Sequence, residues 1–226
     1  MTAAELEVIN TGRRAATAAT PGSWRKVLMH RDVLLLSISY FCMNYVFYIF
    51  SNWLYSYLVQ ERGFKGLESG WLYAAPFVVG AVLAFIGGVV CDSLCRRIGP
   101  RWGCRLPAIV GLSLVAVLLL AGAKSSHPYV AVALLSLCFG FTQFTEGPFW
   151  AASTYIAGPH TAAATGVLNT GGNLVGVLAI AFGHVLDRYG WWPALASGSV
   201  FAVIAAVLWL FVRVQPPPTH DTTAVV

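Results

Sequence analysis

The sequence predicts an all-α fold, a polytopic membrane protein with six transmembrane helices, and three observations support this class. Hydrophobic residues make up 58% of the chain and charged residues 10%, whereas a soluble domain carries roughly 25% charged residues. The mean hydropathy is +0.70, so water would not solvate such a surface. The apolar runs are continuous and long, unlike the alternating segments of about ten residues that form membrane barrels. Helices satisfy their own backbone groups in lipid.

Six apolar runs are long enough to cross a bilayer, which takes about 20 helical residues. Pro107 and Pro128 stand near the start of two runs and suit the first turn of a helix. Because the connections are short, consecutive helices are expected to be antiparallel neighbours. The predicted helices cover residues 32–59, 67–90, 106–123, 128–156, 161–186 and 193–214.

Three regions follow from these runs. Residues 1–31 begin with a polar stretch rich in Ala and Thr, which indicates a flexible cytoplasmic lead or a linker. Residues 32–214 form the six-helix transmembrane bundle. Residues 215–226 contain three consecutive prolines and are expected to be a disordered cytoplasmic tail.

Basic residues gather at one end of the predicted helices. Cytoplasmic flanks of membrane helices carry an excess of Lys and Arg, and ten of the 14 basic residues fall on one side of the bundle. Both termini are therefore expected in the cytoplasm, with the chain in the cell (inner) membrane. The net charge of +5 is explained by these flanks and does not indicate nucleic-acid binding. The ten are Arg13, Arg14, Arg25, Lys26, Arg31, Arg96, Arg97, Arg101, Arg105 and Arg213.

The chain contains five cysteines. Cys42 and Cys138 lie within apolar runs, where Cys behaves as a small hydrophobe. Cys91, Cys95 and Cys104 surround a basic connection, but their spacing matches no zinc pattern and no histidine is near them in the sequence. We expect free, reduced thiols, no metal site and no cofactor.

Glu146 is the one acidic residue deep within a predicted helix. Pro148 cannot donate a backbone hydrogen bond to the carbonyl of Phe144, so the helix is expected to kink there. Ionisable groups in lipid are usually functional, and a broken helix beside a buried acid is one way of building a site at membrane depth. Two interpretations stay open, a carboxyl that faces a cavity and a structural hydrogen bond between helices. The side of the helix shared with Glu146 comprises Thr142, Gln143, Glu146, Trp150 and Ser153.

A polar and aromatic stripe runs along the first predicted helix at steps of three or four residues. Such a stripe suits a solute with hydroxyl groups, which would hydrogen-bond and stack on the rings. Packing against partner helices would equally explain it. The stripe comprises Tyr40, Asn44, Tyr48, Asn52 and Tyr55.

The fifth predicted helix carries two asparagines, Asn169 and Asn173, one turn apart on one face. Gly172 and Gly176 have the spacing of small residues at close helix contacts. The amides would either join helices or bind a ligand.

Three helices bring these polar groups to one level of the membrane. At a rise of about 1.5 Å per residue, Glu146 and Asn169 come to a similar depth on the basic side of the midplane. Asn44 and Tyr48 bracket the centre of the first helix. A purely structural bundle does not require such a level. The candidate substrate-binding residues are therefore Asn44, Tyr48, Glu146, Trp150, Asn169 and Asn173.

Four stretches, taken in order, resemble the major facilitator superfamily, and more narrowly the carboxy-terminal six helices of its anion:cation symporter family. Residues 4–6 and 24–25 also resemble the central cytoplasmic linker, so the likeness extends over residues 1–215. The four stretches are residues 40–58, 88–99, 146–150 and 169–173, which resemble the seventh helix, the second copy of the Gly-xxx-Asp-xxx-Arg-Arg loop, the tenth helix and the eleventh helix.

The resemblance implies transport of a small organic anion, often a sugar acid, coupled to protons or sodium. It places the six candidate residues on the carboxy-terminal wall of a central cavity and assigns Asp92, Arg96 and Arg97 to a gating loop. The family has two six-helix halves, and this chain has one. No Lys or Arg lies deep in the predicted helices, so the charge that binds an anion would come from the other half. We expect the chain to act only with a second bundle, either a separate amino-terminal half or a second copy of itself.

Two other functions compete with this one. An intramembrane protease would need Ser and His facing each other within the bilayer. Ser197, Ser199 and His184 lie near helix ends and form no nucleophile motif, so an enzyme is not expected. A non-transporting truncated remnant or a membrane binding subunit is the alternative, and the adjacent upstream coding sequence would separate it from a transporter half.

Overall fold

The computed structural model describes residues 27–215, which form six helical segments long and apolar enough to cross a membrane. The predicted all-α class and the number of spans are confirmed. Most of the expected lead and tail, residues 1–26 and 216–226, lies outside the described residues. The segments are α3 (Arg31–Ser56) with a π-helical turn (Tyr57–Glu61), α4 (Gly66–Ile98), α5 (Pro100–Lys124), α6 (Pro128–Phe144) with α7 (Glu146–Ala157), α8 (Thr161–Asn173) with a 3-10 turn (Leu174–Val177) and α9 (Leu178–Tyr189), and α10 (Trp191–Trp209).

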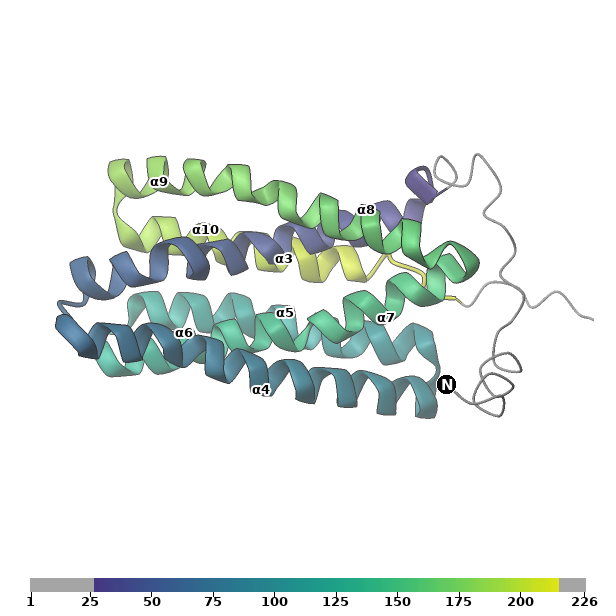
Figure 1. Cartoon of the computed structure of the whole chain (residues 1–226), viewed down its shortest axis with the longest axis horizontal. Coiled ribbons are helices and arrows are strands. Elements are labelled where there is room, and N and C mark those ends of the chain that lie inside the picture. Colours follow the sequence, from purple (N-terminus) through teal and green to yellow (C-terminus); the bar gives the residue numbers. More distant parts are fainter. Residues whose placement is uncertain (1–26, 216–226) are drawn as a thin grey trace, which may run out of the picture.

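The segments lie side by side along one axis (Figure 1), with α8 and α9 at one edge of the view and α4 at the other. Helix α3 packs against α10 and α8, whereas α4 packs against α6 and α5. Helix α10 also packs on α5 and so connects the two groups. Among the six spans α3 is the most buried and α4 the least. Side chains of α3 therefore face other helices, and much of α4 is left to lipid or a partner.

The two ends of the bundle differ in charge. One end carries the α4–α5 connection, the α7–α8 connection and the last residues after α10. Arg96, Arg97, Arg101, Arg105 and Arg213 lie there, and we call it the basic end. The other end carries the α3–α4, α5–α6 and α9–α10 connections.

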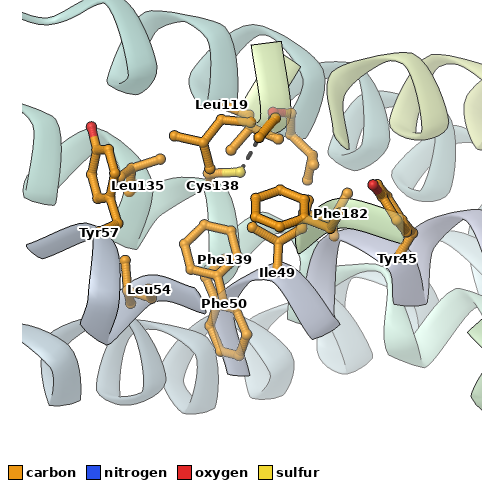
Figure 2. Packing of buried hydrophobic residues seen from close by; sticks show 14 of the residues in the cluster. Tyr45, Ile49, Phe50, Leu54, Tyr57, Leu119, Leu135, Cys138, Phe139 and Phe182 are labelled. Carbon is orange, nitrogen blue, oxygen red and sulfur yellow. Dashed lines mark hydrogen bonds between the residues drawn. The ribbon is translucent and has the colours of Figure 1, made fainter. Parts of the chain in front are cut away.

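Aromatic and branched side chains fill the centre of the bundle. Figure 2 shows Ile49 and Phe50 of α3 close to Phe139 of α6. The ring centroids of Phe50 and Phe139 lie 5.2 Å apart. The Cys138 thiol donates a hydrogen bond to the carbonyl oxygen of Val115 on α5. Such packing and interhelical bonds hold membrane helices together, since lipid is as apolar as their side chains.

The fourth span breaks at Thr145, between α6 and α7, as the position of Pro148 predicts. The Thr145 N–H bonds to the carbonyl oxygen of Thr142, three residues back, at 3.2 Å. The carbonyl oxygen of Phe144, which Pro148 cannot satisfy, points at Gly87 of α4, where an added Cβ would overlap it. The break therefore packs directly against Gly87 of α4.

The fifth span is also interrupted, which the sequence did not predict. After Asn173 the backbone tightens into the 3-10 turn Leu174–Val177 before α9 begins. Mid-helix 3-10 turns often mark hinges or strained sequence. The first part of the span, α8, therefore ends at Asn173, one of the candidate residues from the sequence.

The connection between the second and third spans is shorter than expected. Helix α4 continues through Ile98, and the single residue Gly99, at φ +84°, turns the chain into α5. Pro100, not Pro107, occupies the first turn, and Pro107 lies inside α5. The apolar window used for the prediction ends at residue 90 because polar residues follow, although they stay helical.

Candidate functional site

The carboxylate of Glu146 is held by two side chains. The Tyr40 hydroxyl, on α3, donates to Oε2 at 3.1 Å and to Oε1 at 3.3 Å. The Trp150 indole N–H, one turn along α7, donates to Oε2 at 2.8 Å. The Tyr40 ring also packs edge-on against Phe149 and Trp150, with centroids 5.1 and 6.1 Å away. The acid therefore faces α3, and Oε2 accepts hydrogen bonds from both Tyr40 and Trp150.

Helix α8 approaches α3 closely at the same level. A Cβ placed on Gly172 would overlap the Tyr40 ring and lie 2.8 Å from Nδ2 of Asn44. Asn44 is buried and its amide donates to the carbonyl oxygen of Tyr40 at 3.0 Å. Gly172 is thus the contact point that sets α8 against the polar stripe.

A second group of polar side chains lies on the other side of this contact. The Tyr48 hydroxyl donates to Oδ1 of Asn173 at 3.0 Å. The Asn173 amide nitrogen donates to the backbone oxygen and to the side-chain oxygen of Asn169, at 2.8 and 3.0 Å. The bonds Glu146–Tyr40 and Tyr48–Asn173 therefore join α7, α3 and α8 through one polar face. We call the residues Tyr40, Asn44, Tyr48, Glu146, Trp150, Asn169 and Asn173 the polar face.

The polar face is open along part of its extent. Asn169 and Asn173 are exposed, and the Trp150 side chain is 37% exposed. An apolar hollow in the bundle is lined by Ile49, Phe50 and Trp53 among others, and it does not include the polar face. The arrangement is a wall of hydrogen-bonding groups that is partly exposed.

The charge on the polar face is acidic, because Glu146 is its only ionisable residue besides the tyrosines. Among residues 27–215 one arginine, Arg105, is buried, and it lies near the end of its span. Arg105 is 6% exposed and donates to the carbonyl oxygen of Val212, just after α10, at 2.6 Å. Because α5 is longer than predicted, Arg105 lies in its second turn at the basic end, where it supports the end of α10 and not the site.

The remaining candidates from the sequence are placed elsewhere. Asp92, Arg96 and Arg97 are all exposed on the last turns of α4 at the basic end. Thr142 is buried and donates back to the carbonyl oxygen of Cys138, and Gln143 lies against α4 beside Gly80. Asn52 and Tyr55, further along the stripe, are exposed beyond the polar face.

Tyr40 is the residue that the sequence alone did not select for the site. It belonged to the predicted stripe, and its spacing of four from Asn44 was the available signal. Its bond to Glu146 depends on how α3 and α7 pack, which helical spacing does not reveal.

The Major Facilitator Superfamily model matches residues 4–180 of the chain. The chain belongs to the major facilitator superfamily. The match covers most of the described helices and the predicted linker region that precedes them. The matched residues include the first four spans and most of the fifth, and α10 lies beyond them.

Curated relatives of the chain include transporters of organic anions. The chain is 32% identical to the probable sulfoacetate transporter SauU of Cupriavidus necator, over 94% of this chain and 50% of the relative. It is 27% identical to the D-galactonate transporter of Escherichia coli, over 92% of this chain and 51% of the relative. It is 27% identical to the probable galactarate/D-glucarate transporter GudP of Escherichia coli, over 89% and 45%. The resemblance to the superfamily's anion-transporting family is confirmed, and the chain spans about half the length of these relatives.

Proposed function

We propose that this chain is the carboxy-terminal six-helix half of a major facilitator transporter for a small organic anion, a sugar acid or a related carboxylate. The observation that carries the proposal is the polar face, in which Glu146 is bonded to Tyr40 beside the open amides of Asn169 and Asn173. The relatives support the substrate class, since they include transporters of sulfoacetate, galactonate and glucarate.

The polar face suits the hydroxyl-bearing part of such a solute. The amides of Asn169 and Asn173 offer both donors and acceptors, and Tyr48 and Trp150 supply rings against which a carbon chain packs. Asn44 is buried against Gly172 and positions Tyr40 through its backbone bond. The anionic end of the solute would keep away from Glu146 and meet a cation elsewhere.

That cation belongs to a second bundle in our proposal. The polar face carries no Lys or Arg, and the buried Arg105 is committed at the basic end. Carboxylates are best recognised by a bidentate guanidinium. Alternating access also requires one bundle to rock against another. A separate amino-terminal half or a second copy of this chain would close the wall into a cavity.

Glu146 is our proposed coupling group. It is the carboxyl that lies at membrane depth on the polar face, held by donors that a proton or an ion would displace. Uptake coupled to protons or sodium would then involve a change at this acid when the solute binds.

The basic end is our proposed cytoplasmic side, with the chain in the cell (inner) membrane and both termini inside. Asp92, Arg96 and Arg97 would form the gate there. They stand exposed at the end of α4, which leaves them available to a facing half.

Uptake of labelled D-galactonate, D-glucarate and sulfoacetate by cells that produce this chain with an amino-terminal half tests the proposal. We expect accumulation of at least one acid and its loss in Asn173→Ala, with Asn52→Ala as the matched control outside the polar face. Uptake that is equal in both variants would contradict the assignment of the polar face. Absence of uptake of every acid by a correctly assembled pair would favour a binding subunit or a remnant.

A further inference from the structure

Three cysteines outside the polar face come together at the basic end. Cys91 and Cys95 lie one turn apart on α4, and Cys104 lies on α5. The Sγ atoms are 4.0 Å apart for Cys91 and Cys95, 3.9 Å for Cys91 and Cys104, and 3.6 Å for Cys95 and Cys104. No disulfide joins any pair among the five cysteines, all of which the structure describes. The spacing of the cysteines in the sequence does not predict this triangle, because it forms only when the turn at Gly99 brings α5 against α4.

A close helix contact fixes the triangle. A Cβ placed on Gly103 would lie 2.5 Å from Cα of Cys95 and 2.7 Å from its Sγ atom. The absence of a side chain at Gly103 therefore lets the backbones of α4 and α5 meet at this point. Cys104, the next residue, is thereby directed at the two thiols of α4.

The spacing of the sulfur atoms matches a metal centre. The point equidistant from the three atoms lies about 2.2 Å from each, close to the ~2.3 Å of a zinc–thiolate bond. An ion at this point would lie within bonding distance of all three sulfur atoms. Van der Waals contact alone does not require three thiols to converge on a common point.

We propose that Cys91, Cys95 and Cys104 form a three-thiolate site for a soft monovalent metal ion, Cu(I). Thiolates select Cu(I), Zn(II) or iron–sulfur clusters among biological metals, and sulfur atoms this close together suit a single ion. Among residues 27–215, the three thiols are the only possible metal ligands from His, Cys, Asp or Glu that come together at this place. Cys91 and Cys104 are buried among apolar residues such as Leu112 and Phe149, which leaves little room for water as a fourth ligand. Zinc sites take four ligands, whereas Cu(I) is stable with three.

The charge of the three-thiolate site and the route of the ion to it follow from the neighbouring residues. Binding converts three thiols to thiolates and releases three protons, so the Cu(I) site carries two negative charges. The arginines at positions 96, 97, 101 and 105 stand at the same end of the bundle, and Asp92 follows Cys91 directly in the chain. Cys95 is partly exposed and gives the ion its entrance. A bound ion would join α4 to α5 beside the exposed arginines of α4.

Metal binding to the purified full chain, under reducing conditions in detergent, tests the proposal. Cu(I) is delivered from a bicinchoninate complex, and Zn(II) is titrated in parallel. We expect one Cu(I) per chain, taken up in preference to Zn(II), and loss of that ion in Cys95→Ser. The matched control is the double variant Cys42→Ser/Cys138→Ser, which removes the other two thiols and should still bind one Cu(I).

X-ray absorption of the copper-loaded wild-type chain gives a readout that does not depend on any variant folding. Three sulfur neighbours would support the site, and a different number would contradict it. Retention of Cu(I) by folded Cys95→Ser, loss of it in the control, or tighter binding of Zn(II) than of Cu(I) would each overturn the assignment. The proposal is independent of the transport function, because no residue of the polar face takes part in it.

Discussion

Tyr40 and Glu146 stand 106 positions apart in the chain, and the Tyr40 hydroxyl donates to the Glu146 carboxylate at 3.1 Å. This bond joins α3, the most buried span, to the first residue after the break in the fourth span. The broken backbone and the acid beside it are therefore parts of one arrangement. A solute that binds the polar face would meet a carboxylate whose position is fixed from two helices.

Tyr40→Phe should weaken substrate binding more than it weakens the fold. The ring contacts with Phe149 and Trp150 stay, and one hydrogen bond to a carboxylate is lost, which costs about 1.5–3 kcal/mol. The measurement is substrate affinity in the assembled transporter, with the melting temperature taken alongside. The control is Tyr45→Phe, which loses a bond to Ser197 away from the polar face. Equal affinity losses in the two variants would show that the loss does not depend on the bond between Tyr40 and Glu146.

Glu146→Gln should abolish coupled accumulation and spare exchange of substrate across the membrane. The amide still accepts hydrogen bonds from Tyr40 and Trp150 but cannot release a proton. Uptake against a gradient and counterflow are measured in the same proteoliposomes.

Glu68→Gln is the matched control, since Glu68 also accepts a bond from a tyrosine, Tyr129, but is exposed at the opposite end of the bundle. It should transport as the wild type does. Proton-driven accumulation that survives unchanged in Glu146→Gln would remove Glu146 from the coupling mechanism.

Gly172→Ala should destabilise the chain and disturb the polar face together. The new methyl group would overlap the Tyr40 ring, and overpacking typically costs about 1–3 kcal/mol. Thermal unfolding in detergent measures the loss. Gly171→Ala is its neighbour and control, because a Cβ there would make an ordinary contact of 3.6 Å with Ser37. Identical melting temperatures for the two variants would contradict the close approach of α8 to α3.

Gly87→Ala should destabilise the chain by a similar amount, about 1–3 kcal/mol, because the methyl group would overlap the Phe144 carbonyl at the break. Gly88→Ala, where a Cβ would meet nothing within 4 Å, should be close to neutral. The comparison of unfolding temperatures tests whether the break rests on α4. A stable Gly87→Ala variant would mean that the break is free to move away from that helix.

Much of the fold could be predicted from hydrophobicity alone. The six spans, their order and the break before Pro148 follow from apolar run length and from the missing N–H of proline. The true ends could not be predicted in this way: α4 continues to Ile98 because charged residues remain helical once the helix leaves lipid. The 3-10 turn Leu174–Val177 has no hydrophobic signature, since glycines permit it without requiring it.

The candidate site was predictable in part. Helical periodicity gathers Asn169 with Asn173, and Glu146 with Trp150, because these pairs lie one turn apart on single helices. The bonds between helices, Tyr40 with Glu146 and Tyr48 with Asn173, depend on rotation and approach of the helices. The same holds for Cys104 and the two thiols of α4, whose convergence depends on the contact at Gly103.

The dependence on a second bundle is tested most directly by transport of a labelled sugar acid in proteoliposomes that contain this chain alone or with an amino-terminal half. The oligomeric state of the lone chain is fixed beforehand by cross-linking. We predict that a monomer gives no uptake above empty liposomes and that the paired halves give Glu146-dependent uptake. Robust uptake by the monomer would contradict the account, because six helices with one open polar wall would then suffice for transport.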